Sequence, residues 1–419
     1  MSAKSELSHR RLGELELLFH QTGKRFRAFT LSTVLHLEGT ICPLTVQAAV
    51  RRAISGDPYL IARLTGGWQP EIVLSPAEPV VQVVPRTSED LWKSTLQHEV
   101  NTPVDQTCGQ QHVGQCRAVV LHGTDKHEIV ISVNHVVCDG EVLKALIGRI
   151  LRECIGRDSD GTNQPQRLYP PFDRTVSFGQ WLRSTSGFFR QIMLSFRQSG
   201  VFRKPDSQTR EEQGDQTFPG FLTLSVQDSR QLFDVCRAHG LKVTSVLAAA
   251  VFAAMLECGF SSRSLLLQLN VDHRRQDARL TTQVSGVASF WELLLVRMRD
   301  GESLLSVARS LNDQIADAAQ RNEVPPFGYG RIVSWFIRWK GGQDYCTSDV
   351  MLSNLGRLSA MPTAEHLKLS ELHIATSQNG CGSQCGCAGG SQGGCRSRVV
   401  RGKGTQAIGI GVSGLGKTS

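Results

Sequence analysis

Segments with strand-like and helix-like patterns alternate along both halves of this chain, and the alternation limits the folds open to it. In the first half, a partly β-branched run at 29–37 precedes a helical pattern at 44–53. In the second half, a strand pattern at 220–226 precedes helical patterns at 229–239 and 244–258. Because strands that alternate with helices pack into layers of sheet and helix, we predict an α/β fold with mixed sheets in two lobes.

A polar stretch at 155–215 separates the two halves, and Gly, Asp and Pro are frequent in it. Within it lies an amphipathic, basic piece at 188–203. We expect this piece to cover the junction of the lobes, with contact to a membrane surface as the alternative. The predicted division of the chain is an N-terminal lobe at 1–165, a linker at 166–215, a C-terminal lobe at 216–380 and a tail at 381–419.

The tail is rich in Gly and Arg and has almost no large apolar residues, which predicts disorder. Its cysteines follow a C-x3-C-x-C-x7-C spacing that is not usual for zinc, so we expect no metal site; they are Cys381, Cys385, Cys387 and Cys395. Residues 411–418 match the nucleotide-binding pattern G-x4-G-K-[ST]. No helix can follow them in this sequence to face a phosphate, so we expect no nucleotide there.

The distribution of charge and the length of the apolar segments indicate which partners and which location to expect. Much of the net charge of +8 comes from the tail, which holds no acidic residue, so we expect no nucleic acid partner. The N-terminus lacks an apolar signal region, and no apolar run reaches the roughly 18 residues that a membrane span needs. The cysteines before the tail are scattered, as is typical of reduced thiols. We expect a cytoplasmic protein and a monomer.

The segment NHVVCDG at 134–140 carries the clearest chemistry, since it joins a predicted strand to a predicted helix. The side chain of His135 titrates near neutral pH, so it can take a proton from a hydroxyl or amine that attacks an acyl carbon. The carboxylate of Asp139 can hold the turn or the imidazole in place if a cation neutralises it. Gly140 lets the backbone turn sharply. Alone, the pattern is also typical of a turn histidine that is hydrogen-bonded to a neighbour.

This segment resembles the HHxxxDG signature of the chloramphenicol-acetyltransferase-like superfamily. That superfamily includes peptide-synthetase condensation domains, polyketide-associated acyltransferases, wax-ester synthases and alcohol acyltransferases. Further elements are similar and occur in the family's order: LGELE at 12–16, LHLEG at 35–39, DPYL at 57–60, NVDHR at 270–274 and DVMLSNLG at 349–356. The resemblance covers most of residues 10–380 and implies two lobes that meet along a central channel.

The resemblance also implies roles for single residues. His135 would be the general base at the middle of the channel, and Asp139 would be structural. Arg274 is a candidate ion-pair partner of Asp139, or else an exposed arginine at a strand end. Ser353 and Asn354 would line the channel or support the oxyanion, or else belong only to a strand end.

Three further features bear on these roles. Asn134 stands where the family has its first histidine, which shifts the expected reaction from peptide bond formation towards ester formation. Cys138 is a thiol close to a histidine, but it falls at a variable position of the motif, and we do not expect it to be a nucleophile. The family normally continues with a strand and a closing helix where residues 381–419 stand, so we interpret this tail as an altered C-terminus.

The expected function is an acyltransferase that moves an acyl group to a hydroxyl, or less favourably to an amine. The acyl donor would be the thioester of CoA or of a phosphopantetheinyl carrier protein, which makes a carrier protein a candidate partner. No permanently bound cofactor and no metal are expected. Two alternatives stay open: a free-standing condensation domain of the peptide-synthetase type, and a catalytically inactive binding protein with the same fold.

Overall fold

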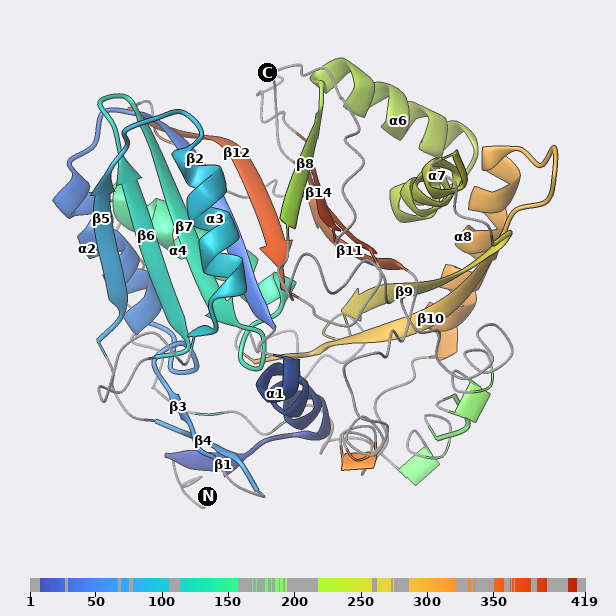
Figure 1. Ribbon diagram of the computed structural model, residues 1–419, viewed down its shortest axis with the longest axis horizontal. Helices are drawn as coiled ribbons and strands as arrows, with labels where there is room; N and C mark the ends of the chain where they lie inside the picture. Colours follow the sequence, from blue (N-terminus) through green and yellow to red (C-terminus); the bar gives the residue numbers. More distant parts are fainter. Residues whose placement is uncertain are drawn as a thin grey trace, which may run out of the picture.

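The computed structural model describes twelve main ranges and single positions between them. These ranges are 8–26, 29–66, 69–74, 78–104, 114–156, 218–257, 262–272, 286–321, 350–357, 366–377, 383–389 and 406–412. Most of the predicted linker at 166–215 lies outside the described residues. The described elements form a mixed α/β fold whose two larger sheets lie in separate halves of the molecule (Figure 1).

The first large sheet has five strands in the order β12-β2-β7-β6-β5. Its strands are β2 (Thr30–Gly39), β5 (Val80–Pro85), β6 (Cys116–His122), β7 (Lys126–Asn134) and β12 (Leu367–Thr376). Helices α2 (Pro43–Ser55) and α4 (Gly140–Cys154) lie behind this sheet in Figure 1, and α3 (Leu91–Asn101) lies in front. Because helices cover both faces, β7 is buried at every position from His127 to Val133 instead of alternating.

A smaller sheet and one helix stand beside the first large sheet. The small sheet has the order β1-β4-β3, with β1 (His9–Arg11), β3 (Arg63–Leu64) and β4 (Glu71–Val73). Helix α1 (Glu14–Phe26) follows β1 directly. The buried guanidinium of Arg10 pairs with Glu16 at 2.6 Å, and the backbone N–H of Gly13 donates to the same carboxylate. These contacts fix the start of α1 within the LGELE segment.

The second large sheet has the order β10-β9-β11-β13-β14-β8. Its strands are β8 (Phe218–Leu224), β9 (Ser264–Asp272), β10 (Ser289–Arg297), β11 (Val350–Arg357), β13 (Ser383–Gly389) and β14 (Gln406–Val412). Helices α6 (Val226–Ala238), α7 (Val243–Glu257) and α8 (Leu304–Arg321) pack beside it. A separate apolar core forms here, with Phe252 of α7 and Leu311 of α8 fully buried.

Helix α7 matches the helical pattern predicted at 244–258, and several of its residues are buried in this core. Among the described helices, none alone has the length and apolar character to cross a membrane. Only α6 and α7 taken together satisfy both criteria, and they are bent by 110° relative to each other.

Strand β12 differs from the predicted division of the chain. It falls inside the segment 216–380 assigned to the C-terminal lobe, yet it pairs antiparallel with β2 in the first sheet, with Leu372 opposite Leu35. The pattern of residues in a strand determines which face is apolar but not which sheet supplies the neighbour. The second half of the chain therefore completes the sheet of the first half.

The tail also differs in part from its predicted disorder. Strands β13 and β14 lie in parallel between β11 and β8, so they fill the middle of the second sheet. Backbone pairing needs no large side chains, and a gap between β11 and β8 would leave backbone N–H and C=O groups of both strands unpaired. Residues 381–382, 390–405 and 413–419, which include most of the G-x4-G-K-[ST] match, lie outside the described residues.

Candidate active site

The segment 134–140 forms the turn between the end of β7 and the start of α4, as predicted. The side chain of Asn134 shapes this turn. Its Oδ1 accepts from the backbone N–H of Val136 at 3.0 Å, and its Nδ2 donates to Oε1 of Gln115 at 2.9 Å. Asn134 therefore shapes the backbone that carries His135 through its side-chain amide. A histidine ring at this position would not fit these contacts in the same way.

His135 is held by aromatic residues that the sequence analysis did not single out. Its backbone N–H donates to the carbonyl oxygen of Phe29 at 2.9 Å, and its ring packs on Phe19 and Phe29 with ring centres 5.0 and 6.3 Å away. Phe29 has a φ of 78°, the one positive φ among the described non-glycine residues. A bulky residue in this region of φ is strained, and such strain concentrates at functional sites. No sequence signal marks it.

The environment of His135 favours the neutral imidazole. Burial lowers the pKa of His135, while the charge of Asp139 and the backbone groups of His135 and Cys138 act in the opposite direction and do not restore it. Its Nδ1 is buried and makes no aligned hydrogen bond to the described residues. A neutral imidazole is the form that can accept a proton at neutral pH.

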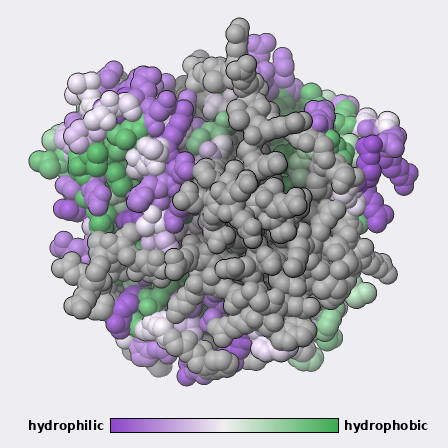
Figure 2. All heavy atoms as spheres, viewed as in Figure 1, coloured by the Kyte–Doolittle hydropathy of each residue, from purple (hydrophilic) through white to green (hydrophobic). Residues whose placement is uncertain are grey.

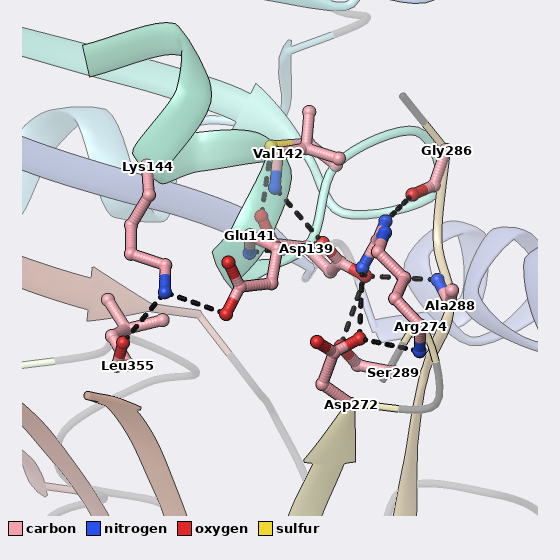
Figure 3. A network of polar contacts seen from close by, with 11 residues as sticks. Asp139, Glu141, Val142, Lys144, Asp272, Arg274, Gly286, Ala288, Ser289 and Leu355 are labelled. Carbon is pink, nitrogen blue, oxygen red and sulfur yellow. Dashed lines mark hydrogen bonds and ion pairs between the residues drawn. The ribbon is translucent and has the colours of Figure 1, made fainter. Parts of the chain in front are cut away.

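Asp139 joins the two halves of the molecule (Figure 3). As the N-cap of α4, its Oδ1 accepts from the backbone N–H groups of Glu141 and Val142, both at 3.2 Å. Its Oδ2 accepts from Nη1 of Arg274 at 2.7 Å, and from Ala288 and Ser289 at the start of β10, both at 3.0 Å. Five donors thus hold one buried carboxylate.

These donors keep Asp139 ionised. Burial alone would raise its pKa, but the charge and hydrogen bond of Arg274, with the backbone N–H groups of Ala288 and Val142, lower the pKa below its ordinary value. A carboxylate with every lone pair used in this way orients the loop and is poorly suited to exchange protons. This geometry agrees with the structural role expected for Asp139.

The sequence left two interpretations of Arg274 open, an ion-pair partner of Asp139 or an exposed arginine at a strand end. The structure decides between them. Its side chain is 9% exposed, so it is not an exposed arginine at a strand end. Besides Asp139 it contacts Oδ1 of Asp272 at 3.3 Å and donates through Nη2 to the carbonyl oxygen of Gly286. The guanidinium therefore pairs with two carboxylates, Asp139 of the β7–α4 turn and Asp272 of β9.

Gly140 and Lys144 make a second contact between the halves. A Cβ atom on Gly140 would lie 2.2 Å from Cδ2 of Leu355 in β11, so a side chain here would require Leu355 to move. One turn later, Nζ of Lys144 donates to the carbonyl oxygen of Leu355 at 2.9 Å and to Oε1 of Glu141 at 2.6 Å. The start of α4 is thus packed directly on β11 (Figure 3).

The remaining predicted residues differ in their surroundings. The amide of Asn354, within β11, is exposed and donates to Oγ1 of Thr244 in α7 at 2.9 Å. Ser353 is half-buried in β11. Cys138 is a buried free thiol whose Sγ lies 3.4 Å from the carbonyl oxygen of Asp139. Burial raises the pKa of Cys138 well above its usual range, which agrees with its exclusion as a nucleophile.

Comparison with known proteins supports the resemblance drawn from the motifs. Residues 217–389 match the family model of the phthiocerol/phthiodiolone dimycocerosyl transferase C-terminus. A search of curated proteins finds no match to this sequence. Among solved structures, polyketide synthase associated protein 5 from Mycobacterium tuberculosis is 16% identical with a TM-score of 0.60, and the match covers 90% of each chain.

Two further structures have the same fold. Trichothecene 15-O-acetyltransferase from Fusarium sporotrichioides has a TM-score of 0.64 at 14% identity, with 88% of this chain and 86% of that chain covered. The starter condensation domain of rhizomide synthetase in complex with C8-CoA has a TM-score of 0.57 at 14% identity, with 89% and 84% covered. The chain therefore has the fold of the chloramphenicol-acetyltransferase-like superfamily. Its second half matches a transferase family within that fold.

Proposed function

We propose that this protein is an acyltransferase in which His135 is the general base and a thioester is the acyl donor. The observation that carries the proposal is the position of a neutral, aromatic-packed histidine on a turn that Asp139 ties to both halves of the molecule. A base must be held in one orientation to act on a bound substrate, and the Asp139 network supplies that restraint.

The proposed reaction moves one proton and one acyl group. The hydroxyl oxygen of the acceptor attacks the thioester carbonyl carbon while an imidazole nitrogen of His135 takes the hydroxyl proton. Because Nδ1 is buried, Nε2 is the nitrogen left to accept it. The carbon–sulfur bond of the resulting intermediate then breaks, and His135 returns the proton to the leaving thiolate. Asp139 stays ionised throughout and holds the loop.

The donor and acceptor are proposed from the superfamily. The relative solved with C8-CoA supports a CoA thioester as donor, and a phosphopantetheinyl carrier protein is the alternative with the same thioester group. The relative named as a 15-O-acetyltransferase supports a hydroxyl acceptor. No permanent cofactor is required by this scheme. On sequence grounds the proposal also includes a monomeric protein in the cytoplasm and a channel between the lobes.

Two alternative functions remain distinguishable from this one. A condensation domain of the peptide-synthetase type would form an amide from an amine acceptor, and here the first histidine of its signature is Asn134, which the structure uses to shape the turn. A catalytically inactive binding protein of this fold would bind a thioester without turnover. Acceptor choice separates the first alternative, and turnover separates the second.

A His135→Ala comparison tests the proposed base. The purified chain is given acyl-CoA substrates with alcohol or amine acceptors, and release of free thiol is measured. We expect kcat/KM to fall by about 10²–10⁴-fold in His135→Ala, the usual contribution of a positioned general base. For the parent we expect kcat/KM to rise with pH through a value below 6.5, because burial lowers the pKa of His135 and only the neutral form is a base.

Cys138→Ser is the matched control, since it changes a buried neighbour on the same turn and leaves the imidazole in place. Its turnover should stay close to that of the parent. Equal turnover in His135→Ala and the parent would remove His135 from the mechanism, and a parent without turnover on any acceptor would favour the inactive binding protein.

We also propose that the stretch around 178–193 contacts an anionic membrane surface. The apolar side chains of Phe178, Leu182, Phe189 and Met193 are 53–77% exposed. Apolar atoms show at the lower right edge of Figure 2, the side on which Figure 1 draws the helical pieces of this stretch. Between Asp173 and Asp206 the sequence holds basic residues and no acidic ones. Basic charge beside exposed apolar side chains is typical of segments that lie in a membrane interface.

A further inference from the structure

A cluster of histidine and glutamate side chains lies on the first large sheet, away from His135, and the proposed acyl transfer does not use it. His36 is on β2, and Glu371 and His373 are on β12. One ligand atom from each of the three side chains lies within 4.8 Å of the other two. Two imidazoles and one carboxylate are a ligand set that zinc uses in sites with an open fourth position.

The strand pairing brings these residues to one face of the sheet. His36 lies directly opposite Glu371 on one side and Glu128 of β7 on the other. The register of β12 shifts between Leu369 and Glu371, and this shift places Glu371 and His373 on the face of His36. Such irregularities re-aim side chains and are frequent beside functional sites.

One ligand atom of the cluster lacks the partner that burial demands. Nε2 of His36 is buried and makes no hydrogen bond to the described residues. The side chain of His373 is only 4% exposed, and its Nε2 lies 3.1 Å from Oε2 of Glu371. A buried polar atom without a partner is costly, and a bound cation would supply the partner that Nε2 of His36 needs.

The spacing of the rings suits a shared metal ion. The ring centres of His36 and His373 are 5.0 Å apart. Two imidazoles bound to one tetrahedral zinc ion at about 2.0 Å place their ring centres about 5 Å apart. The contact of 3.1 Å between Glu371 and His373 is also close to the separation of about 3.3 Å between neighbouring ligands of such an ion.

The surroundings would support the ligands. Oε1 of Glu128 lies 3.7 Å from Nδ1 of His36, the arrangement in which a carboxylate orients a metal-bound histidine. Arg86 neutralises Glu128 at 2.9 Å, so Glu371 is the carboxylate left to offset the charge of the ion. The indole of Trp92 from α3 stacks on His373 with ring centres 4.9 Å apart. Glu371 is 37% exposed, which leaves a path for an ion and a water molecule.

We propose that His36, Glu371 and His373 form a binding site for a zinc-class divalent ion at the edge where β12 joins the first sheet. Phe221 of β8 also packs on His373, with ring centres 4.7 Å apart. A bound ion would therefore brace the point at which both large sheets meet.

Zinc binding to the purified full chain tests the proposal. Cys381, Cys385, Cys387 and Cys395 are first changed to Ser, because tail thiolates would bind zinc adventitiously. After dialysis against a chelator, zinc is titrated by calorimetry and Co²⁺ is added separately to record its visible spectrum. We expect one ion per chain, the absorption of a tetrahedral Co²⁺ site and a higher Tm with zinc than without it.

Single substitutions test whether His36, Glu371 and His373 are the ligands of the bound zinc ion. His36→Gln, His373→Gln and Glu371→Gln should each weaken zinc binding by at least about tenfold, since even the loss of an outer-shell partner costs that much. Glu371 is partly exposed, so its variant is expected to fold, which a thermal melt checks. His122→Gln is the matched control: His122 stacks on His127 at the end of the same sheet and should leave binding unchanged. Absence of zinc binding by the parent, or equal binding by the parent and Glu371→Gln, would overturn the proposal.

Discussion

At the scale of single residues, the candidate site depends on a few buried polar groups more than on the histidine alone. Asp139 accepts from backbone groups of α4 and from Arg274, Ala288 and Ser289 of the other half. Its carboxylate is 1% exposed, so each of these donors replaces water that it has lost. The same residue thus fixes the turn of His135 and joins the two halves.

Removal of Arg274 should therefore be costly for stability. Arg274→Ala leaves a buried carboxylate without its cation, and we expect the free energy of unfolding to fall by about 3–5 kcal/mol, as for other broken buried pairs. Denaturant unfolding followed by fluorescence measures it. Arg237→Ala, which removes an arginine from the exposed pair with Asp234, should change the stability little. Equal stability of Arg274→Ala and the parent would contradict the role given to this pair.

At the scale of elements, the start of α4 is the structural joint of the molecule. Asp139 caps the helix, Gly140 lets β11 approach, and Lys144 bonds to Leu355 of that strand. An N-cap, a glycine and a lysine are ordinary at a helix start, and each could serve a helix exposed to water. Their common purpose appears only once β11 lies against them.

Gly140→Ala tests this close approach. The added methyl group would meet Cδ2 of Leu355, so we expect a loss of about 1–3 kcal/mol of stability, typical of overpacking. In a Leu355→Ala background the same Gly140→Ala change should cost less, because the added methyl group then meets no Cδ2 atom. Gly148→Ala is the control in the same helix, because its nearest atom lies at an ordinary 3.7 Å and the change should stabilise slightly. Thermal melts of Gly140→Ala, Leu355→Ala, their combination and Gly148→Ala test this prediction.

The exposed apolar side chains of Phe178, Leu182, Phe189 and Met193 lead to a separate prediction. Phe178→Ser with Leu182→Ser removes two of them, and we expect binding to vesicles of anionic lipid to weaken by more than tenfold. Co-sedimentation with anionic and neutral vesicles measures it. Leu44 is 69% exposed on α2, far from these residues in sequence, so Leu44→Ser should bind as the parent does. If the parent protein does not co-sediment with anionic vesicles, the proposed membrane contact is wrong.

At the scale of the whole molecule, each large sheet depends on distant parts of the chain. β12 enters the first sheet beside β2, while β13 and β14 fill the second sheet between β11 and β8. Loss of a central strand breaks two rows of hydrogen bonds and exposes two edges that can pair with other molecules. The tail therefore matters for the stability of a lobe to which it contributes few large side chains.

Truncation after residue 380 should accordingly destabilise the protein, although the composition of the tail predicts disorder. We expect a lower Tm and soluble aggregates in size-exclusion chromatography, because β11 and β8 lose their neighbours. Truncation after residue 412 keeps both strands and is the matched control. A chain ending at residue 380 that stays monomeric with an unchanged Tm would show that the second sheet does not need β13 and β14.

The sequence by itself determined much of the local structure and the chemistry of the candidate site. The helical pattern at 244–258 predicted α7 within a residue, and the strand–turn–helix pattern placed His135 and Asp139 where the structure has them. These features depend on neighbours in sequence, which a single chain displays directly.

Only the tertiary structure decided which distant segments meet. It paired Arg274 with Asp139, brought Phe29 under His135 with a positive φ, joined β12 to the first sheet and gave the glycine-rich tail a place in the second. The physical reason is that a buried charge or an unpaired backbone edge takes whichever partner the packed fold brings within reach, and sequence spacing carries no record of that choice.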